Sequence, residues 1–366
     1  MGTVHNNVDR LLIVNTTNRR RGAEVRSLRL QPGLRERGWE VDLVSLTAER
    51  DAPTIPAQPI SGVAAGQLGR FEPVVLRGLR HHLRRHRYDL MLANGSATLR
   101  YAVGASSGIL PRRRLGYTAI GEPRYWSTSR TSRWLQRRLL ARVGFHLAVS
   151  AATADQLRTL VSPNASIEVV YGGVPNDLLQ ITRPPRSGSL HLLSVGGLTA
   201  EKDPVAAIKI LQRTEMARHM RLRFVGAGPL ATEAARTAHS AGLSDRVEFP
   251  GATADISTHL KWAHALILTS RSEGLPGVVL EASASEVPTV AFDVGGTREV
   301  IADGATGRLI THGDHSGFAA ALDLLEADEP LRRRWGEAAR RMVEASFLLD
   351  HAADRYDAAL RRHLEG

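Results

Sequence analysis

The sequence predicts an α/β protein made of two successive doubly wound domains, each a parallel sheet covered by helices. Three observations lead to this prediction. The chain has 366 residues, more than one ordinary core accommodates. Short apolar runs alternate with helical patterns in both halves. Residues 182–188, Thr-Arg-Pro-Pro-Arg-Ser-Gly, interrupt the alternation with a composition that sustains neither helix nor sheet. We therefore predict a first domain over residues 1–183 and a second over residues 184–348.

The first half opens with an apolar run at residues 11–15, which predicts a buried strand. A loop to Glu24 and a helical pattern to about Arg37 follow, and Gly38 is placed to end that helix. Further strands are expected at residues 38–45, 89–93, 115–119, 147–150 and 167–171.

The second half restarts the same alternation. Apolar runs predict strands at residues 190–195, 222–225, 247–249, 265–268 and 289–292, and residues 348–364 predict a closing helix. Parallel sheets bind ligands outside the carboxyl ends of their strands, so the loops that follow these runs are the places to look for a site.

Composition excludes several kinds of chemistry. Cysteine is absent, which rules out disulfides, thiolate metal sites and thiol catalysis. The first ten residues form no signal core, and no apolar run approaches the ~20 residues that span a bilayer. We expect a cytoplasmic protein.

The net charge of +11 is unevenly placed. Residues 1–183 contain 27 Arg, no Lys and 13 acidic residues, a net charge of +14, whereas residues 184–366 carry 21 Lys plus Arg and 24 acidic residues, a net charge of −3. The basic half suits anionic lipid, an acidic substrate or nucleic acid, or it reflects only an arginine-rich coding bias.

Residues 269–282, Thr-Ser-Arg-Ser-Glu-Gly-Leu-Pro-Gly-Val-Val-Leu-Glu-Ala, read as a loop that leads from the strand at 265–268 into a helix. Pro276 fits the first helical position, which leaves the N–H groups of residues 277–279 available to a phosphate. Glu273 and Glu281 would repel an anion unless they bind neutral hydroxyls beside it. A nucleotide-sugar, with a diphosphate between two polyols, meets that demand. Such a pattern also occurs at ordinary helix starts.

Other glycine-bearing loops follow strands of the same domain. Gly196 and Gly197 precede Lys202, Gly226 and Gly228 follow the next strand, and residues 293–299 form a further loop. Glycines let backbone approach a diphosphate closely, and Lys202 supplies a positive charge. Each loop alone is a weak signal, but together they converge on one sheet edge.

These residues resemble the family 4 retaining glycosyltransferases of the GT-B fold. The likeness covers nearly all of the second domain: Val-Gly-Gly-Leu at 195–198 with Lys202, Val-Gly-Ala-Gly-Pro-Leu at 225–230, Arg-Val-Glu-Phe-Pro-Gly at 246–251, the 270–282 segment, Asp-Val-Gly-Gly-Thr-Arg-Glu-Val at 293–300, and Asp-Gly-x-Thr-Gly at 303–307. The first domain is similar only at Gly22-Ala-Glu24, at 148–150 and at 171–174. The resemblance implies two Rossmann-like domains facing a cleft, with a C-terminal helix, about 349–366, crossing back to the first domain.

The resemblance also implies roles for individual residues. Glu281 would hold the ribose hydroxyls and Glu273 the transferred sugar, with the backbone of Gly274, Leu275, Pro276, Gly277 and Val278 around sugar and diphosphate. Lys202 would neutralise the leaving diphosphate, and Gly22 would let a first-domain loop close over it. The family needs no metal, and the sequence has no Asp-x-Asp.

Two departures from the family pattern concern the reacting centre. Gly197 stands where an Arg is usual, which removes one cation from the diphosphate, although Arg271, Arg298 or an Arg of the first domain are candidates to replace it. Ile120 stands about where the family often has a His. Glu122 is then a candidate polar group toward the acceptor, or it only caps a turn.

Two segments, residues 77–87 and 130–142, place Leu or Trp among Arg at helical spacing. Such helices either lie on an anionic membrane surface or bury the apolar side in their own core, and we expect the second. We expect His81, His82 and His86 to be surface groups and not metal ligands, because no set of His, Asp and Glu has convincing spacing.

We therefore predict a glycosyltransferase, with the donor on the second domain and an acceptor on the basic first domain. The acceptor is a sugar, lipid-linked or small molecule, and peripheral contact with an anionic membrane fits the charge; neither a cofactor nor a metal is expected. One alternative is a nucleotide-sugar epimerase or hydrolase on the same scaffold. The other is a basic nucleic-acid-binding module, against which the sequence offers no helix-turn-helix or aromatic-interleaved basic motif.

Overall fold

The computed structural model describes residues 8–49, 53–64, 71–122, 129–182 and 188–364. The chain divides into two compact units: the first combines Met1–Gly173 with Leu349–Gly366, and the second is Val174–Leu348. Most of the expected linker, residues 183–187, lies outside the described residues. Residues 174–182, which the sequence assigned to the first domain, belong to the second unit. They pack there because η4 (Asn176–Gln180) contacts α9 (Gly277–Ala284), with the Ser285 hydroxyl donating to the Leu178 carbonyl at 3.3 Å.

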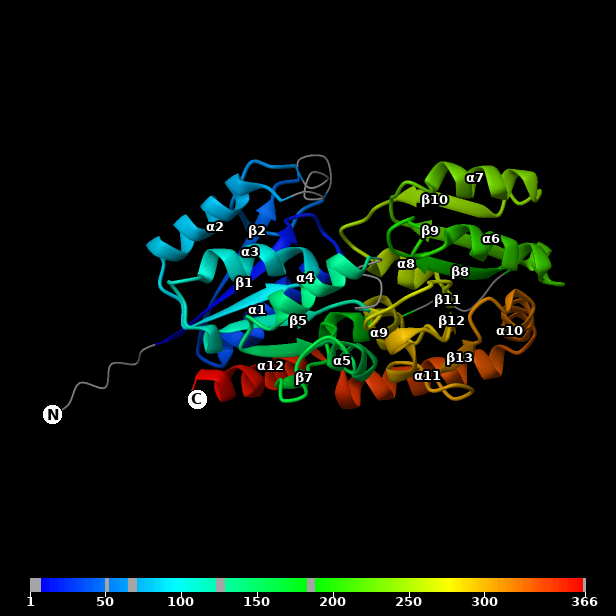
Figure 1. Ribbon diagram of the computed structural model, residues 1–366. Coiled ribbons are helices and arrows are strands. Elements are labelled where there is room, and N and C mark those ends of the chain that lie inside the picture. The colour runs from blue at the N-terminus through cyan, green and yellow to red at the C-terminus, as the bar shows by residue number, and fades with distance from the viewer. Residues whose placement is uncertain (1–7, 50–52, 65–70, 123–128, 183–187, 365–366) are drawn as a thin grey trace. The chain divides into compact units, whose positions relative to one another are not determined.

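The first unit contains a seven-stranded parallel sheet in the order β3-β2-β1-β4-β5-β6-β7 (Figure 1). The strands are β1 (Asp9–Thr17), β2 (Trp39–Thr47), β3 (Gln58–Pro59), β4 (Leu90–Asn94), β5 (Leu115–Ala119), β6 (Phe145–Ala148) and β7 (Ile167–Val169). Alternate side chains of β1 enter different cores. Leu12 and Val14 face one core, and Leu11 and Ile13 face the other. Both faces of this sheet are therefore buried, as a parallel sheet requires.

Helices cover the two faces of that sheet. Those of the first unit are α1 (Gly22–Glu36), α2 (Pro73–Arg85), α3 (Ser96–Ser106), α4 (Arg130–Leu140), α5 (Ala151–Arg158) and α12 (Leu349–Leu364). Residues of α2 and α3 share the core of Leu12, whereas α1 and the C-terminal α12 share the core of Leu11. The closing helix therefore packs on α1, from which it is separated by more than 300 residues of sequence.

The second unit contains a six-stranded parallel sheet in the order β10-β9-β8-β11-β12-β13. Its strands are β8 (Leu190–Val195), β9 (Met220–Val225), β10 (Val247–Gly251), β11 (Ala265–Leu268), β12 (Thr289–Phe292) and β13 (Gly307–Ile310). Its helices are α6 (Pro204–Arg213), α7 (Ala231–Ser240), α8 (Ser257–Trp262), α9, α10 (His315–Ala327) and α11 (Glu329–Ser346). Side chains of α6, α7 and α10 share one core with the sheet, and α9 packs against α11.

These two sheets confirm the prediction of two doubly wound α/β domains. None of the described helices is long and apolar enough to cross a bilayer.

The two basic segments differ in how they pack. α2 buries Val75, Leu79 and Leu83, so the expectation of a core-facing helix is confirmed there. In α4 it is confirmed at Leu139 and Leu140, which meet the core, and wrong at Trp134 and Leu135, which are 57% and 50% exposed. The expectation for His82 is also wrong, because this side chain is buried and its Nε2 lies 2.8 Å from the Tyr88 hydroxyl.

Candidate functional site

The strand order of the second sheet reverses between β8 and β11. In a doubly wound sheet, the loops that leave such neighbouring strands in opposite directions open a crevice at the carboxyl edge, where ligands bind. The loop after β8 leads to Lys202, and the loop after β11 leads to Glu273. The two charged residues predicted to act on a donor therefore flank the switch point.

Lys202 and Glu273 form an ion pair, with the lysine Nζ 2.6 Å from the carboxylate Oε1. Glu273 is buried, and the hydroxyl of Ser270 donates to the same oxygen at 2.6 Å. Burial, the largest single effect, would lower the pKa of Lys202, but the charge and hydrogen bond of Glu273 together with the charge of Glu201 outweigh it, and the pKa is raised. The ammonium is thus held charged, beside a carboxylate whose orientation is fixed by two donors.

Further hydrogen bonds join the loops around this pair. The Thr269 hydroxyl donates to the carbonyls of Lys202 at 3.2 Å and Asp203 at 3.0 Å. The Arg271 amide donates to the Glu201 carbonyl at 2.8 Å. Because these contacts run between backbone and short side chains, the separation of the two loops is set independently of the ion pair.

The helix that carries Glu281 begins one residue later than predicted. Pro276 has an extended conformation and is the N-cap of α9, so the first helical residue is Gly277. The Val279 amide donates to the Pro276 carbonyl at 3.0 Å. This N–H group, which was predicted to bind an anion, is therefore already used within the helix. Gly277 and Val278 are the first two helical residues, so the helix itself supplies no carbonyl partner for their N–H groups. Glu281 lies one turn further on and is partly exposed.

Gly226 and Gly228 have a packing role that the sequence did not suggest. A Cβ on Gly226, whose φ is +155°, would lie 1.8 Å from the carbonyl oxygen of Gly196, and a Cβ on Gly228 would lie 2.3 Å from that of Leu198. These glycines let the loops after β8 and β9 approach each other. By contrast, the nearest atom to a Cβ on Gly197 is a methyl of Thr199 at 3.4 Å, so this position has room for a side chain.

The two arginines of this unit that were candidates to replace the missing cation are each paired with a carboxylate. Arg271 donates to Asp203 through Nε at 2.8 Å and Nη2 at 2.7 Å, and Arg298 pairs with Asp293. Among the residues that the structure describes, no group of three or more His, Asp or Glu is placed to hold a metal ion.

The first sheet reverses its strand order between β1 and β4, and a buried polar cluster lies at that edge. Asn94 Nδ2 donates to Asn15 Oδ1 at 2.7 Å and to the Ala23 carbonyl at 3.3 Å. Asn15 Nδ2 donates to Ser27 Oγ at 3.0 Å, and that hydroxyl donates to the Glu24 carbonyl at 2.8 Å. The cluster ties the start of α1 to the ends of both strands.

Gly22 and Glu24, at the start of α1, bear on the first-domain loop that was predicted to close over the diphosphate. Gly22 opens α1, and a Cβ there would meet no atom within 4 Å, so no steric demand in this unit explains the glycine. The Glu24 side chain is buried, and this burial raises its pKa to about 7, against smaller opposing effects of backbone hydrogen bonds and Arg21. A carboxyl that changes charge near neutral pH therefore sits next to the loop.

Glu122 follows β5 at the same edge of the first sheet and is buried. Its Oε2 accepts a hydrogen bond from Gln156 Nε2 of α5 at 2.7 Å. Ile120 packs where the family often has a His: its Cδ1 would lie 2.8 Å from a Cβ on Gly95. The rest of that predicted loop, Pro123 and Arg124, falls outside the described residues.

Sequence reasoning missed the residues that position the charged pair. Ser270 contacts Glu273, and Asp203 contacts Arg271. In the first unit, Asn15 and Asn94 anchor the loop before α1. A signal existed for the asparagines, since each is a polar residue at the carboxyl end of an otherwise apolar run.

Both units match models of glycosyltransferase families. Residues 182–342 match the model described as glycosyl transferases group 1, and residues 20–178 match the one described as glycosyltransferase family 4. Over 222 residues the chain is 29% identical to the N-acetyl-alpha-D-glucosaminyl L-malate synthase of Bacillus anthracis. That alignment covers 57% of each protein, so the chain spans little more than half the length of this curated relative.

Solved structures share the architecture of both units. Sucrose-phosphate synthase from Thermosynechococcus elongatus has a TM-score of 0.81 at 18% identity, covering 97% of this chain and 98% of that one. Anabaena HepE in complex with UDP-glucose has a TM-score of 0.80 at 20% identity, covering 96% and 99%. These likenesses confirm the predicted GT-B fold. The two family models, which together match residues 20–178 and 182–342, show that the chain belongs to the family 4 glycosyltransferases.

Proposed function

We propose that this chain transfers a sugar from a nucleoside-diphosphate-sugar to an acceptor, with retention of anomeric configuration and without a metal ion. The observation that carries the proposal is the Lys202–Glu273 pair, 2.6 Å apart at the switch point of the second sheet and next to the N-terminus of α9. The site combines a cation for a diphosphate with carboxylates for hydroxyls.

Each group has a distinct task in this reaction. The bond from the anomeric carbon to the diphosphate oxygen breaks and a bond from that carbon to the acceptor oxygen forms. Negative charge accumulates on the departing diphosphate, which takes up the proton that the acceptor hydroxyl loses. Lys202 and the N–H groups at the start of α9 stabilise that charge, which is the largest electrostatic demand of the step. Glu273 orients the transferred sugar and Glu281 binds the ribose. The family resemblance assigns Glu122 to the acceptor and Gly22 to the loop after β1, and these two roles stay predictions.

Retention and metal independence rest on the family resemblance, and the absence of Asp-x-Asp from the sequence supports the second. UDP-glucose is the first donor to test, because HepE, which shares the fold, is described in complex with it. The net charge of +14 over residues 1–183 supports an anionic acceptor, and acceptor turnover that ignores ionic strength would count against this.

Thermal stabilisation by UDP-, GDP-, ADP- and dTDP-sugars tests the donor, because a ligand that binds only the native state raises the melting temperature. Glu281→Ala should abolish the shift. NMR analysis of the product anomer tests retention. Turnover of the donor without an acceptor would instead indicate a hydrolase or epimerase.

A further inference from the structure

Helix α4 presents apolar side chains to solvent on a strongly basic surface. Its only buried residue is Leu140, while Trp134 is 57% and Leu135 50% exposed. By contrast, Trp39 and Trp335 are only 2% and 5% exposed, so a solvent-facing indole is not general among the described tryptophans. Exposing both side chains to water costs free energy that burial in an apolar environment would recover.

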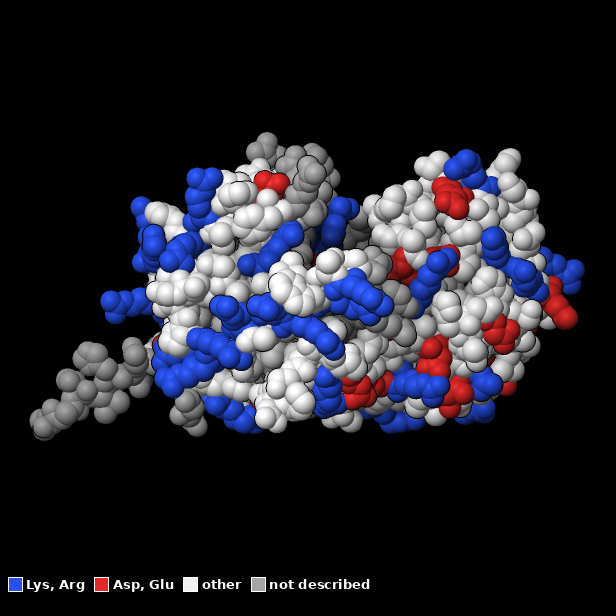
Figure 2. Space-filling view, in the orientation of Figure 1, with Lys and Arg blue, Asp and Glu red and all other residues white. Residues whose placement is uncertain are grey.

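Arginines surround Trp134 on this helix. Arg130 lies one turn before it, and Arg137 and Arg138 lie one turn after it, so the four share one side of α4. The Arg138 guanidinium carbon is 4.5 Å from the centre of the indole ring. Figure 2 shows the same character over the visible face of the first unit, where basic side chains greatly outnumber acidic ones.

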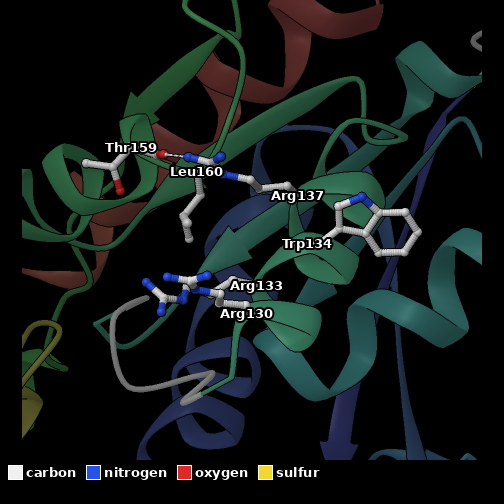
Figure 3. Close-up of a pocket in the computed structure, with 6 residues that line it drawn as sticks. All are labelled: Arg130, Arg133, Trp134, Arg137, Thr159 and Leu160. Carbon is white, nitrogen blue, oxygen red and sulfur yellow. Dashed lines mark hydrogen bonds between the residues drawn. The ribbon is translucent and has the colours of Figure 1, made fainter.

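A cavity of about 380 Å³ lies between α4 and the residues after α5. Its lining consists of Arg130, Arg133, Trp134, Arg137, Thr159 and Leu160, with no acidic residue among them. In Figure 3 the guanidinium groups of Arg130 and Arg133 lie side by side, and the indole of Trp134 points away from them. Arg137 donates to the Thr159 carbonyl at 2.8 Å.

The arginines of this cavity lack carboxylate partners within the described part of the chain. No salt bridge there involves Arg130, Arg133, Arg137 or Arg138, whereas the carboxylate of Asp155 on α5 pairs with Arg158. Guanidinium groups gathered in one concavity repel each other, and an anion placed among them relieves that repulsion. The cavity therefore favours phosphate-bearing groups.

We propose that α4 docks this protein on an anionic membrane, with lipid phosphates at Arg130, Arg133 and Arg137 and with Trp134 and Leu135 in the headgroup layer. A lipid surface satisfies both properties of the helix at once: it supplies negative charge, and it buries an aromatic and an aliphatic side chain. A nucleic acid would neutralise the arginines but would leave Leu135 in water. The inference uses none of the residues proposed to bind the donor, so it stands or falls independently of the proposed activity.

Vesicle sedimentation tests the docking. The full chain should bind vesicles in which a third of the lipid is phosphatidylglycerol, bind phosphatidylcholine vesicles far less, and be released by high salt. Since one basic residue near an anionic surface is worth roughly a factor of five, Arg130→Gln/Arg133→Gln should weaken binding roughly 10- to 30-fold. Trp134→Ser/Leu135→Ser should weaken binding at low salt without changing how steeply binding falls as salt is added, because the loss is apolar.

A matched control removes the same charge elsewhere. Arg333→Gln/Arg334→Gln changes two exposed arginines of α11 whose cavity also contains Glu329 and Glu337, and it should leave vesicle binding unchanged. Circular dichroism establishes that all variants fold.

Three results would overturn the proposal: no binding to phosphatidylglycerol vesicles, equal binding to phosphatidylcholine vesicles, or an equal loss in the α11 control. Arg130- and Arg133-dependent binding of single-stranded DNA without vesicle binding would assign the surface to a nucleic acid instead. A further readout locates the helix: spin-labelled lipid should quench the tryptophan fluorescence of the wild type, and Trp134→Phe should remove most of that quenching.

Discussion

Replacing Lys202 by Met tests how the ion pair holds the candidate site. The substitution keeps most of the aliphatic side chain and removes the ammonium. It leaves the Glu273 carboxylate buried, with the Ser270 hydroxyl at 2.6 Å as a remaining donor. Glu273→Gln is the complementary change, because it removes the negative charge and keeps the shape. The two variants and their combination form a double-mutant cycle.

The expected loss of folding stability in Lys202→Met follows from the geometry of the ion pair. Unit charges at the observed 2.6 Å separation attract each other by about 6 kcal/mol at an effective dielectric constant of ~20, before desolvation is subtracted. Removing one partner of a fully buried pair costs about 3–5 kcal/mol, but the Lys202 side chain is 31% exposed, so solvent reduces the loss. We expect Lys202→Met to destabilise the second unit by about 1–3 kcal/mol. For a unit of this size that is a decrease in melting temperature of roughly 2–12 °C.

Differential scanning calorimetry measures this change, because it separates the unfolding of the two units if they melt independently. Lys209→Met, at an exposed position of α6, is the control and should stay within about 0.5 kcal/mol of the wild type. The cycle should give a coupling energy of about 1–2 kcal/mol between Lys202 and Glu273. A coupling energy of zero, or a Lys202→Met melting temperature equal to that of the control, would refute the reasoning.

Three further predictions concern individual positions. The raised pKa of Glu24, from 4.5 to about 7, means that the folded state binds the proton more tightly, so the contribution of Glu24 to stability falls as pH rises from about 4.5 to about 7 and is flat above. Glu24→Gln should remove that fall, so the stability of the variant relative to the wild type should be roughly 1–3 kcal/mol higher at about pH 8 than at about pH 5. A difference in urea midpoint between variant and wild type that is equal at the two pH values would contradict this. Gly226→Ala should destabilise the second unit by about 3 kcal/mol or more, because the added Cβ would lie 1.8 Å from the Gly196 carbonyl oxygen. Gly277→Ala, whose Cβ would have no atom within 4 Å, should change the stability by less than about 1 kcal/mol. Similar urea midpoints for the two variants would show that the close approach of the loops is not needed. Gly197→Arg should tighten donor binding in a salt-dependent way, because the position has room for a side chain and lacks the cation that is usual there. Unchanged or weaker binding in calorimetric titration would indicate that another group neutralises the diphosphate.

Strand positions were predictable because buried parallel strands are continuous apolar runs. The bounds of β5, β8, β11 and β12 match the predicted runs residue for residue. β3 and β13 were missed, the first because it has only two residues, and the second because Gly307 and Arg308 interrupt the apolar signal. The sequence placed Pro276 inside α9, but its extended backbone makes it the N-cap instead.

Tertiary neighbours decided what the sequence left open. Periodicity alone shows that α2 and α4 are both basic helices with apolar residues, yet it does not show which of those residues meet the core. The same applies to the site. The positions of the loops predicted that Lys202 and Glu273 lie at the same edge of the second sheet. The resemblance assigned the two residues to different parts of a donor, and neither argument predicted their direct contact.

Calorimetric titration of donor binding tests the central claim most directly, namely that the second unit binds a nucleoside diphosphate through Lys202, Glu273 and Glu281. The wild type should bind at least one of the UDP-, GDP-, ADP- and dTDP-sugars. Glu281→Ala should weaken that binding at least tenfold, about 1.4 kcal/mol, while Glu233→Ala, at an exposed carboxylate of α7, should leave it unchanged. Binding of none of these donors by the folded wild type, or equal affinity in the Glu281→Ala variant, would contradict the claim.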